Sequence, residues 1–431
     1  MLLRFRVANH RSIRDEQELS LVAVPRKGDP KPTGPIPQTV RVAGIYGANA
    51  SGKSNVLHAV GFMAEAVLYS FARWPIDGGV PRQPFKLDPQ FRDKPSLFEI
   101  DLMLNGKRYT FGFELDDECV RREWLYEYGP TGRTRTLFER AGSEFRFGRT
   151  LGGHTATIAD LTRNNALFAS VAAANGHPLL SELCRAIGAL GRSLLRNGVG
   201  PGGDHLAATA IRMPEIADLA MGWLKMADLG IVGAVEIEGK GELAELVGRF
   251  LAERPGEFDP HVEASARQVV QKRINLLHAG AFGSAVEIDF ADESDGTQIW
   301  LSVAAFVLLS VITGRVLLID EVDSSLHPKL SATIIQMFRD PEINATGAQL
   351  IFTSHDVSLL GNLLADGLLG RDEVWFTEKG ASGDTSLIPL SDFKSRKGEN
   401  FERAYLQGRY GAVPYVDIDE LRRMILRRDA S

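Results

Sequence analysis

The residues best suited to chemistry form a glycine-rich run near the start of this 431-residue chain. The run consists of Gly47, Ala48, Asn49, Ala50, Ser51, Gly52, Lys53, Ser54 and Asn55. The spacing of its glycines, lysine and serine is that of a phosphate-binding loop, whose backbone N–H groups cradle phosphates. Lys53 would reach the β- and γ-phosphates, and the Ser54 hydroxyl would bind Mg²⁺. The alternative is a glycine-rich turn that carries a lysine by chance.

Two adjacent carboxylates, Asp320 and Glu321, follow the apolar run 316–319. This pattern is typical of a buried parallel strand that delivers acids at its C-terminal end, where ligands bind in such sheets. Asp320 would hold Mg²⁺, directly or through water, and Glu321 would orient and deprotonate the attacking water of a phosphoryl transfer. The alternative is a strand that merely ends in two solvated acids.

A histidine, His355, follows the next apolar run, 349–353. At the end of a strand, a histidine can contact a γ-phosphate and respond to its loss, although a lone histidine there can also be structural. Because the loop and the acid pair precede it in the same chain, we predict a functional role for His355.

The segments around these residues predict the elements that position them. A β-type segment, 40–45, precedes the loop and a helix-type segment, 56–63, follows it, which is the context that the loop requires. Residues 285–360 alternate between strand and helix patterns, and such alternation indicates a parallel sheet. The elements expected there are a strand at 285–290, a helix at 298–313, a strand at 316–319, a helix at 327–338 and a strand at 349–353.

Other segments predict different structures. Residues 1–24 contain two strand patterns around a turn. Residues 95–149 contain several more, with a hairpin signal at Asn105 and Gly106, and indicate an antiparallel sheet separate from the parallel one. Residues 157–280 repeat apolar side chains at helical spacing and indicate helices.

The composition is ordinary for a soluble globular protein, with 44% apolar and 24% charged residues. A net charge of −6 does not indicate a nucleic-acid-binding protein, although it is compatible with a local basic face.

Cys119 and Cys184 stand far apart, so we interpret them as inert thiols in a reducing cytoplasm. No apolar leader and no run long enough to span a bilayer is evident, so we expect a cytoplasmic protein that is not in the membrane. The arginine-rich segment 421–428 is amphipathic, and we interpret it as a solvated helix face.

Four features in this order resemble the ABC-type ATPase heads. They are the loop 47–54, the run 293–298, the acid pair 320–321 with residues 323–328 after it, and His355. The long separation between Lys53 and Asp320 is similar to the SMC, RecF and OLD-like branch, and the opening residues 5–12 resemble that branch's first strand and turn. The stretches 390–394 and 405–412 resemble the RloA-type subgroup of prokaryotic ATPases, which is tied to restriction loci and phage defence. The resemblance covers most of the chain and is weakest over 157–280.

The resemblance implies an α/β P-loop NTPase head of the ABC type, with a mixed or parallel sheet, an antiparallel β subdomain and an inserted helical subdomain. The expected parts are an N-terminal ATPase lobe at 1–94, the β subdomain at 95–156, the helical insertion at 157–284, a C-terminal ATPase lobe at 285–390 and a tail at 391–431.

The resemblance also assigns roles to single residues. Ser294, Gly296 and Thr297 match the signature loop, which in this family caps the ATP held by a partner subunit, although the match departs from the usual Leu-Ser-Gly-Gly-Gln pattern. Asp323 matches the loop that communicates across the dimer. Asn9 and Arg11 match a nucleotide-contacting turn, for which a structural turn is the alternative. Gln83 is the candidate for the glutamine loop.

These matches imply a Mg²⁺-dependent ATPase that forms a homodimer through its nucleotide. In the first hypothesis for its role, the ATPase controls a separate, nuclease-like effector in anti-phage defence. In the second, it is a RecF-like DNA repair or maintenance ATPase that clamps DNA directly. A third reading, a scaffold with negligible turnover, is disfavoured by the intact pair Asp320 and Glu321. Too few residues follow Asp356 for a nuclease domain, so nuclease activity is not expected in this chain.

Overall fold

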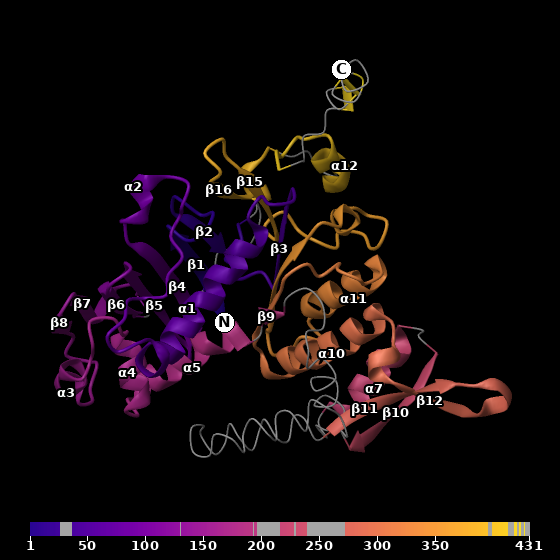
Figure 1. The fold of residues 1–431 in the computed structure, drawn as a ribbon, viewed down its shortest axis with the longest axis horizontal. Coiled ribbons are helices and arrows are strands. Elements are labelled where there is room, and N and C mark those ends of the chain that lie inside the picture. The colour runs from indigo at the N-terminus through magenta and orange to yellow at the C-terminus, as the bar shows by residue number, and fades with distance from the viewer. Residues whose placement is uncertain are drawn as a thin grey trace.

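A computed structural model describes most of the chain. The described residues are 1–25, 37–129, 131–192, 194–195, 216–227, 230–238, 272–394, 399–412, 418–419, 422–423 and 426. Within them, a largely parallel sheet and an antiparallel sheet lie on either side of helix α1 (Lys53–Arg73) (Figure 1).

The parallel sheet carries the phosphate loop on one of its inner strands. Its strand order is β16-β15-β3-β14-β13-β9, and only β16 runs antiparallel to its neighbour. Strands β3, β14 and β13 are buried along their whole length, as apolar runs in a sheet covered on both faces should be. The strands are β3 (Val42–Gly47), β9 (Leu194–Leu195), β13 (Val316–Ile319), β14 (Gln349–Ser354), β15 (Val374–Lys379) and β16 (Thr385–Pro389).

The antiparallel sheet has the order β2-β1-β4-β5-β6-β7-β8. Asn105 and Gly106 both have positive φ, 50° and 74°, and form the predicted hairpin turn between β4 and β5. Because β1 pairs with β4, the segment 1–94 contributes to both sheets. The strands are β1 (Leu2–Ala8), β2 (Gln17–Ser20), β4 (Ser96–Leu104), β5 (Lys107–Leu115), β6 (Val120–Tyr128), β7 (Thr134–Ala141) and β8 (Glu144–Phe147).

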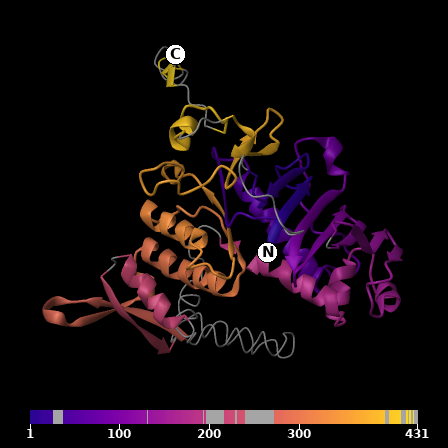
Figure 2. The ribbon, with the colours of Figure 1, turned by 180° about the vertical axis from the view of Figure 1, so that it is seen from behind.

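Helices pack between and around the sheets (Figures 1 and 2). Helix α1 and helix α5 approach closely at Gly188, where a β-carbon would lie 2.5 Å from the Leu68 side chain. On the far face of the parallel sheet, α10 and α11 belong to a second apolar core. Helices α1 and α10 are long and apolar enough to cross a membrane, but more than half of each apolar stretch is buried, as in a core helix.

The bounds of the remaining helices are as follows. The α-helices are α2 (Pro89–Arg92), α3 (Thr155–Asp160), α4 (Phe168–Ala174), α5 (Pro178–Arg192), α7 (Ala217–Met226), α10 (Asp295–Thr313), α11 (Pro328–Arg339) and α12 (Phe401–Leu406), and the 3₁₀ helices are η1 (Ala281–Gly283), η2 (Phe290–Asp292), η3 (Val357–Leu360) and η4 (Leu390–Asp392).

The region predicted as wholly helical also contains strands. Strand β11 (Lys272–Ala279) pairs with β10 (Ile231–Glu238) on one side and with β12 (Ala285–Asp289) on the other, in a separate antiparallel sheet. The helical prediction is therefore wrong for β10 and β11, and β12 does not join the parallel sheet as expected. Alternating apolar and acidic residues in β10 and β12 suit a half-exposed antiparallel strand, whereas a strand in the parallel sheet would have to be apolar throughout.

His10 ties the turn after β1 to helix α1. It is fully buried, its Nε2 lies 2.9 Å from His58 Nδ1, and the rings of Phe62 and Phe98 pack around it. Burial, reinforced by the positive charges of His58 and Arg11, lowers the pKa of His10 to about 3. The folded chain therefore keeps His10 neutral at pH values where the unfolded chain protonates it.

We expect the free energy of unfolding to fall as the pH drops below about 6.5, because only the unfolded chain then gains a proton at position 10. We expect His10 to account for a fall of about 2 kcal/mol in the free energy of unfolding between about pH 7 and about pH 5. Urea unfolding at the two pH values would measure this fall. The His10→Gln variant keeps a hydrogen-bonding side chain that cannot titrate and should lose correspondingly less. An equal loss in both proteins would contradict this assignment.

Candidate functional site

The phosphate-loop residues turn sharply between β3 and α1. Gly52 precedes the helix with φ of 109°, and Ala50 has φ of 62°. A β-carbon on Gly52 would lie 2.1 Å from Thr385 Oγ1, so both the backbone angle and the available space require glycine there. Because α1 begins at Lys53, the unpaired N–H groups and the positive end of its dipole lie at this loop, where an anion is favoured.

Threonines of strands β15 and β16 form hydrogen bonds to the phosphate loop. Ser51 Oγ lies 2.6 Å from Thr377 Oγ1, and Thr385 Oγ1 donates to the Ser51 carbonyl at 2.8 Å. Thr385 Oγ1 also lies 2.7 Å from Ser12 Oγ, which links the loop to the turn after β1. The buried Ser51 thus connects the loop to Thr377 and Thr385. Sequence reasoning missed these two threonines, because single threonines in strand segments are common and carry no motif.

Lys53 lies at the centre of the site. Its Nζ donates to the carbonyls of Gly47 and Ala48 at 2.8 and 3.1 Å and lies 3.3 Å from His355 Nδ1. Burial lowers the pKa of Lys53 to about 8, against the opposing effect of the nearby carboxylates, of which Glu321 is the strongest. His355, which the sequence places some 300 residues away, therefore shares the environment of the loop lysine.

Asp320 and Ser54 meet as the sequence predicts for a Mg²⁺ site. Ser54 Oγ donates to Asp320 Oδ1 at 2.9 Å, and Thr353 Oγ1 donates to the same oxygen at 2.6 Å. A hydroxyl and a carboxylate are the oxygen ligands that Mg²⁺ prefers. Ser54 and Asp320 therefore form a donor set that fits Mg²⁺.

Glu321 has an unusual backbone. Its φ is 56°, a left-handed conformation that is uncommon for residues other than glycine. The Glu321 N–H donates to Thr353 Oγ1 at 2.7 Å, and the next residue, Val322, donates its N–H to the Thr353 carbonyl at 3.0 Å. Thr353 thus stabilises a strained turn at the end of β13, and its hydroxyl links the Asp320 carboxylate to the Glu321 backbone N–H. Sequence reasoning missed Thr353, because it stands inside an apolar strand.

His355 faces Glu321 across the edge of the sheet. Its Nε2 lies 3.8 Å from Glu321 Oε1, and both side chains are partly exposed. The His355 N–H lies 3.3 Å from both carboxylate oxygens of Asp323. The structure therefore brings together the phosphate loop, the acid pair, His355 and Asp323 at the C-terminal edge of the parallel sheet.

Asn9 has a different environment. It is buried, and its side-chain amide donates to the carbonyls of Phe91 and Lys94, at 2.8 and 2.7 Å, while its Oδ1 accepts the N–H of Phe85 at 2.9 Å. These bonds fasten residues 85–94 to the turn after β1. They give Asn9 a structural role, which is the alternative that the sequence left open for this turn.

Arg11 and Gln83 lie together beside the phosphate loop. Arg11 Nε donates to Gln83 Oε1 at 2.8 Å, and its Nη1 lies 3.4 Å from Oδ1 of Asn55 in the first turn of α1. Asn55 Nδ2 in turn donates to Ser12 Oγ at 2.6 Å. Both the predicted nucleotide-contacting turn and the candidate glutamine-loop residue are therefore next to the start of α1.

The predicted signature residues begin helix α10. Ser294 Oγ caps the helix by accepting the Thr297 N–H at 3.2 Å, and a β-carbon on Gly296 would lie 2.9 Å from the Ser325 carbonyl. Among the described residues, no hydrogen bond or ion pair joins Ser294, Gly296 or Thr297 to the phosphate loop of the same chain. The signature loop instead packs beside the turn that carries Asp323.

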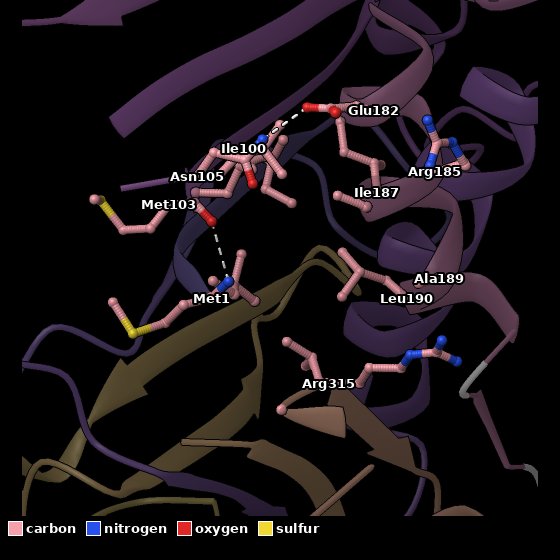
Figure 3. Close-up of a pocket in the computed structure, with 16 residues that line it drawn as sticks. Met1, Ile100, Met103, Asn105, Glu182, Arg185, Ile187, Ala189, Leu190 and Arg315 are labelled. Carbon is pink, nitrogen blue, oxygen red and sulfur yellow. Dashed lines mark hydrogen bonds between the residues drawn. The ribbon is translucent and has the colours of Figure 1, made fainter. Parts of the chain in front are cut away.

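A separate cavity of about 470 Å³ lies near the opposite edge of the sheets (Figure 3). Leu2 and Val316, which begin β1 and β13, line it together with Leu190 of α5. The bond between Asn105 and Glu182 crosses its rim in Figure 3. None of the predicted site residues lines this cavity, so it is distinct from the phosphate site.

The comparison with protein families gives one assignment. Residues 42–151 and 227–361, more than half of the chain, match the family described as "AAA domain, putative AbiEii toxin, Type IV TA system". The chain belongs to this family of AAA domains. No curated protein matches it.

Similar solved structures include three SMC heads. The "SMC head domain from Thermotoga maritima" is 13% identical, with 90% of this chain and 98% of that chain covered and a TM-score of 0.41. The "SmcHead bound to the C-winged helix domain of ScpA" is 11% identical, with 90% and 96% covered and a TM-score of 0.44. An Smc head with an extended coiled coil, bound to the C-terminal domain of ScpA derived from Pyrococcus furiosus, is 12% identical, with 91% and 97% covered and a TM-score of 0.38. Because these TM-scores are below 0.5, the confirmed α/β P-loop fold rests on the strand order and the family match.

We expect the Thr353→Val variant to lose about 1–3 kcal/mol of unfolding free energy, because valine leaves the partly buried Glu321 N–H without its acceptor. Urea unfolding measures the loss. Thr353→Ser retains the hydroxyl and should stay closer to the wild-type value. A Thr353→Val protein as stable as the wild type would show that this hydroxyl does not stabilise the turn.

Proposed function

We propose that this member of the AAA-domain family binds Mg²⁺-ATP at the edge of its parallel sheet, closes against a second copy around the nucleotide and hydrolyses the ATP. The observation that carries the proposal is the cluster of Ser54, Asp320, Glu321 and His355 around Lys53, assembled from three separate chain segments. Phosphoryl transfer requires that the reacting groups be positioned and that the negative charge of the phosphates be neutralised, and these residue types can do both.

In the proposed site, each residue has one task. The loop N–H groups and Lys53 bind the phosphates, and Ser54 and Asp320 hold Mg²⁺. A bound Mg²⁺ would neutralise charge on the β- and γ-phosphates. Glu321 orients the attacking water and takes its proton, and His355 contacts the γ-phosphate.

The second copy is part of the proposal because the resemblance to ABC-type heads implies that the signature loop of one subunit caps the ATP held by another. The signature residues Ser294, Gly296 and Thr297 stand at the N-terminal end of α10, where helix geometry favours an anion. Since they do not contact their own phosphate loop among the described residues, we propose that they cap the γ-phosphate of a partner copy. Asp323, beside the signature loop and bonded to the His355 backbone, would link the two sites of the dimer.

For the biological role, we propose that the chain acts in the cytoplasm and controls a separate effector in anti-phage defence. The support is the resemblance of residues 390–394 and 405–412 to RloA-type ATPases. The RloA-type assignment itself is part of this proposal.

We expect Glu321→Gln to bind ATP and remain a dimer, because the amide cannot take the proton from water and the γ-phosphate bridge persists. Lys53→Ala should lose nucleotide binding and show no change of mass when ATP is added. Sedimentation velocity with and without Mg²⁺-ATP measures both, and Glu342→Gln, an exposed glutamate away from the site, is the matched control. A Glu321→Gln protein whose mass, at a fixed protein concentration, is the same with saturating ATP as without it would refute the nucleotide-dependent dimer.

A further inference from the structure

An apolar groove lies on the face of the molecule that carries α7 and α11, away from the phosphate loop. Its volume is about 750 Å³, and it runs between α7, α10, α11 and residues 365–368. Three of its apolar side chains, Leu219, Met226 and Ile343, are about half exposed, at 51%, 52% and 49%. Exposed apolar side chains that gather in one groove are typical of an interaction site.

The wall of the groove is fixed in place. Trp223 of α7 stacks on Trp300 of α10 with ring centroids 4.2 Å apart, and each indole N–H donates to the other residue's carbonyl, at 3.1 and 3.0 Å. Helix α7 is thereby held on the helix that begins at the signature loop. A groove that exists before binding needs little ordering when a ligand enters it.

Two features suit the groove to a helix as its occupant. Gly222 lines it in the middle of α7, and a β-carbon there would meet nothing within 4 Å. Glycine costs a helix about 1 kcal/mol relative to alanine, and it leaves room for another backbone to approach. Met226 and Met337 add flexible apolar side chains that adapt to a bound surface.

The rim of the groove is acidic. Asp218, Asp340 and Asp366 line it, whereas its one lining arginine, Arg339, is already paired. Arg339 donates to the carbonyls of Gly367 and Leu368 and forms an ion pair with Glu373. The groove therefore fits an amphipathic helix with apolar anchors and basic flanks.

The chain itself contains such a segment in its tail. Ile418, Leu421 and Ile425 recur at helical spacing. The segment 418–428 is basic overall, because its four arginines, Arg422, Arg423, Arg427 and Arg428, outnumber its two acidic residues, Asp419 and Glu420. Of the described side chains, Ile418 is 67% exposed and Leu426 is 62% exposed. In both ribbon views, α12, the helix that precedes this segment in the chain, lies at the opposite end of the molecule from α7 (Figures 1 and 2).

We propose that the segment 418–428 of one copy docks into the α7–α11 groove of a second copy. Because groove and tail are different surfaces, the contact is head-to-tail, and each copy can both give and receive a tail. This contact does not involve the nucleotide, so it is independent of the ATP-dependent dimer proposed above. It would build assemblies larger than that dimer.

The test uses the full chain without nucleotide, in sedimentation velocity across a concentration series. We expect the wild type to form species that grow with concentration. Leu219→Glu in the groove and Ile418→Glu in the tail should each abolish this growth. Leu161→Glu, which changes a leucine of similar exposure, 54%, on the other lobe, is the matched control and should assemble as the wild type does.

Mixing the two variants gives the decisive result. The Leu219→Glu protein still offers an intact tail and the Ile418→Glu protein an intact groove, so an equimolar mixture should regain a one-to-one dimer and nothing larger. Growth that survives in both variants, a wild type that stays monomeric, or a mixture that stays monomeric would overturn the proposal. Circular dichroism of each variant shows that the substitutions, all at exposed positions, leave the chain folded.

Discussion

The site depends on the position of β14 between β3 and β13. This parallel pairing places the end of one strand, with Thr353 and His355, between the phosphate loop on one side and the acid pair on the other. Since parallel strands end at the same edge of a sheet, three segments far apart in the sequence deliver their polar residues to one place. A change in the order or register of these strands would separate Lys53 from Asp320, whatever the local sequence.

At that edge, a few hydroxyl groups determine the geometry. Thr353 joins Asp320 to the strained backbone of Glu321, while Thr377 and Thr385 hold the phosphate loop through Ser51. Left-handed conformations such as that of Glu321 cost energy and persist only where neighbouring groups fix them. The C-terminal hairpin β15–β16 is therefore part of the site, although it contributes none of the residues that we propose to contact the nucleotide.

The sequence predicted the parts of the site that local spacing encodes. The loop glycines, the acid pair and His355 each stand at a change from an apolar run to polar residues, and the described geometry places them together. Thr353 could not be identified in this way, because its role arises from contacts with residues on another strand. At Asn9, by contrast, the motif match predicted a contact with the nucleotide. In the structure, the side-chain amide of Asn9 instead forms hydrogen bonds to residues 85–94.

The fold was less predictable where two patterns compete. The last residues of β10 alternate between apolar and acidic and indicate a half-exposed strand, but long stretches of helical spacing around them favoured helices over 157–280. The sequence also did not indicate that β1 belongs to the antiparallel sheet, because β1 pairs with β4, which lies about a hundred residues away in the sequence. Such long-range pairings follow from tertiary packing and not from local propensity.

The most direct measurement is a crystal structure of the chain with a non-hydrolysable ATP analogue and Mn²⁺, in which anomalous scattering locates the metal. We expect the Mn²⁺ peak between Ser54 and Asp320, with Lys53 against the terminal phosphates. A nucleotide bound elsewhere, or a metal peak remote from Asp320, would contradict the assignment of this edge of the sheet as the ATP site.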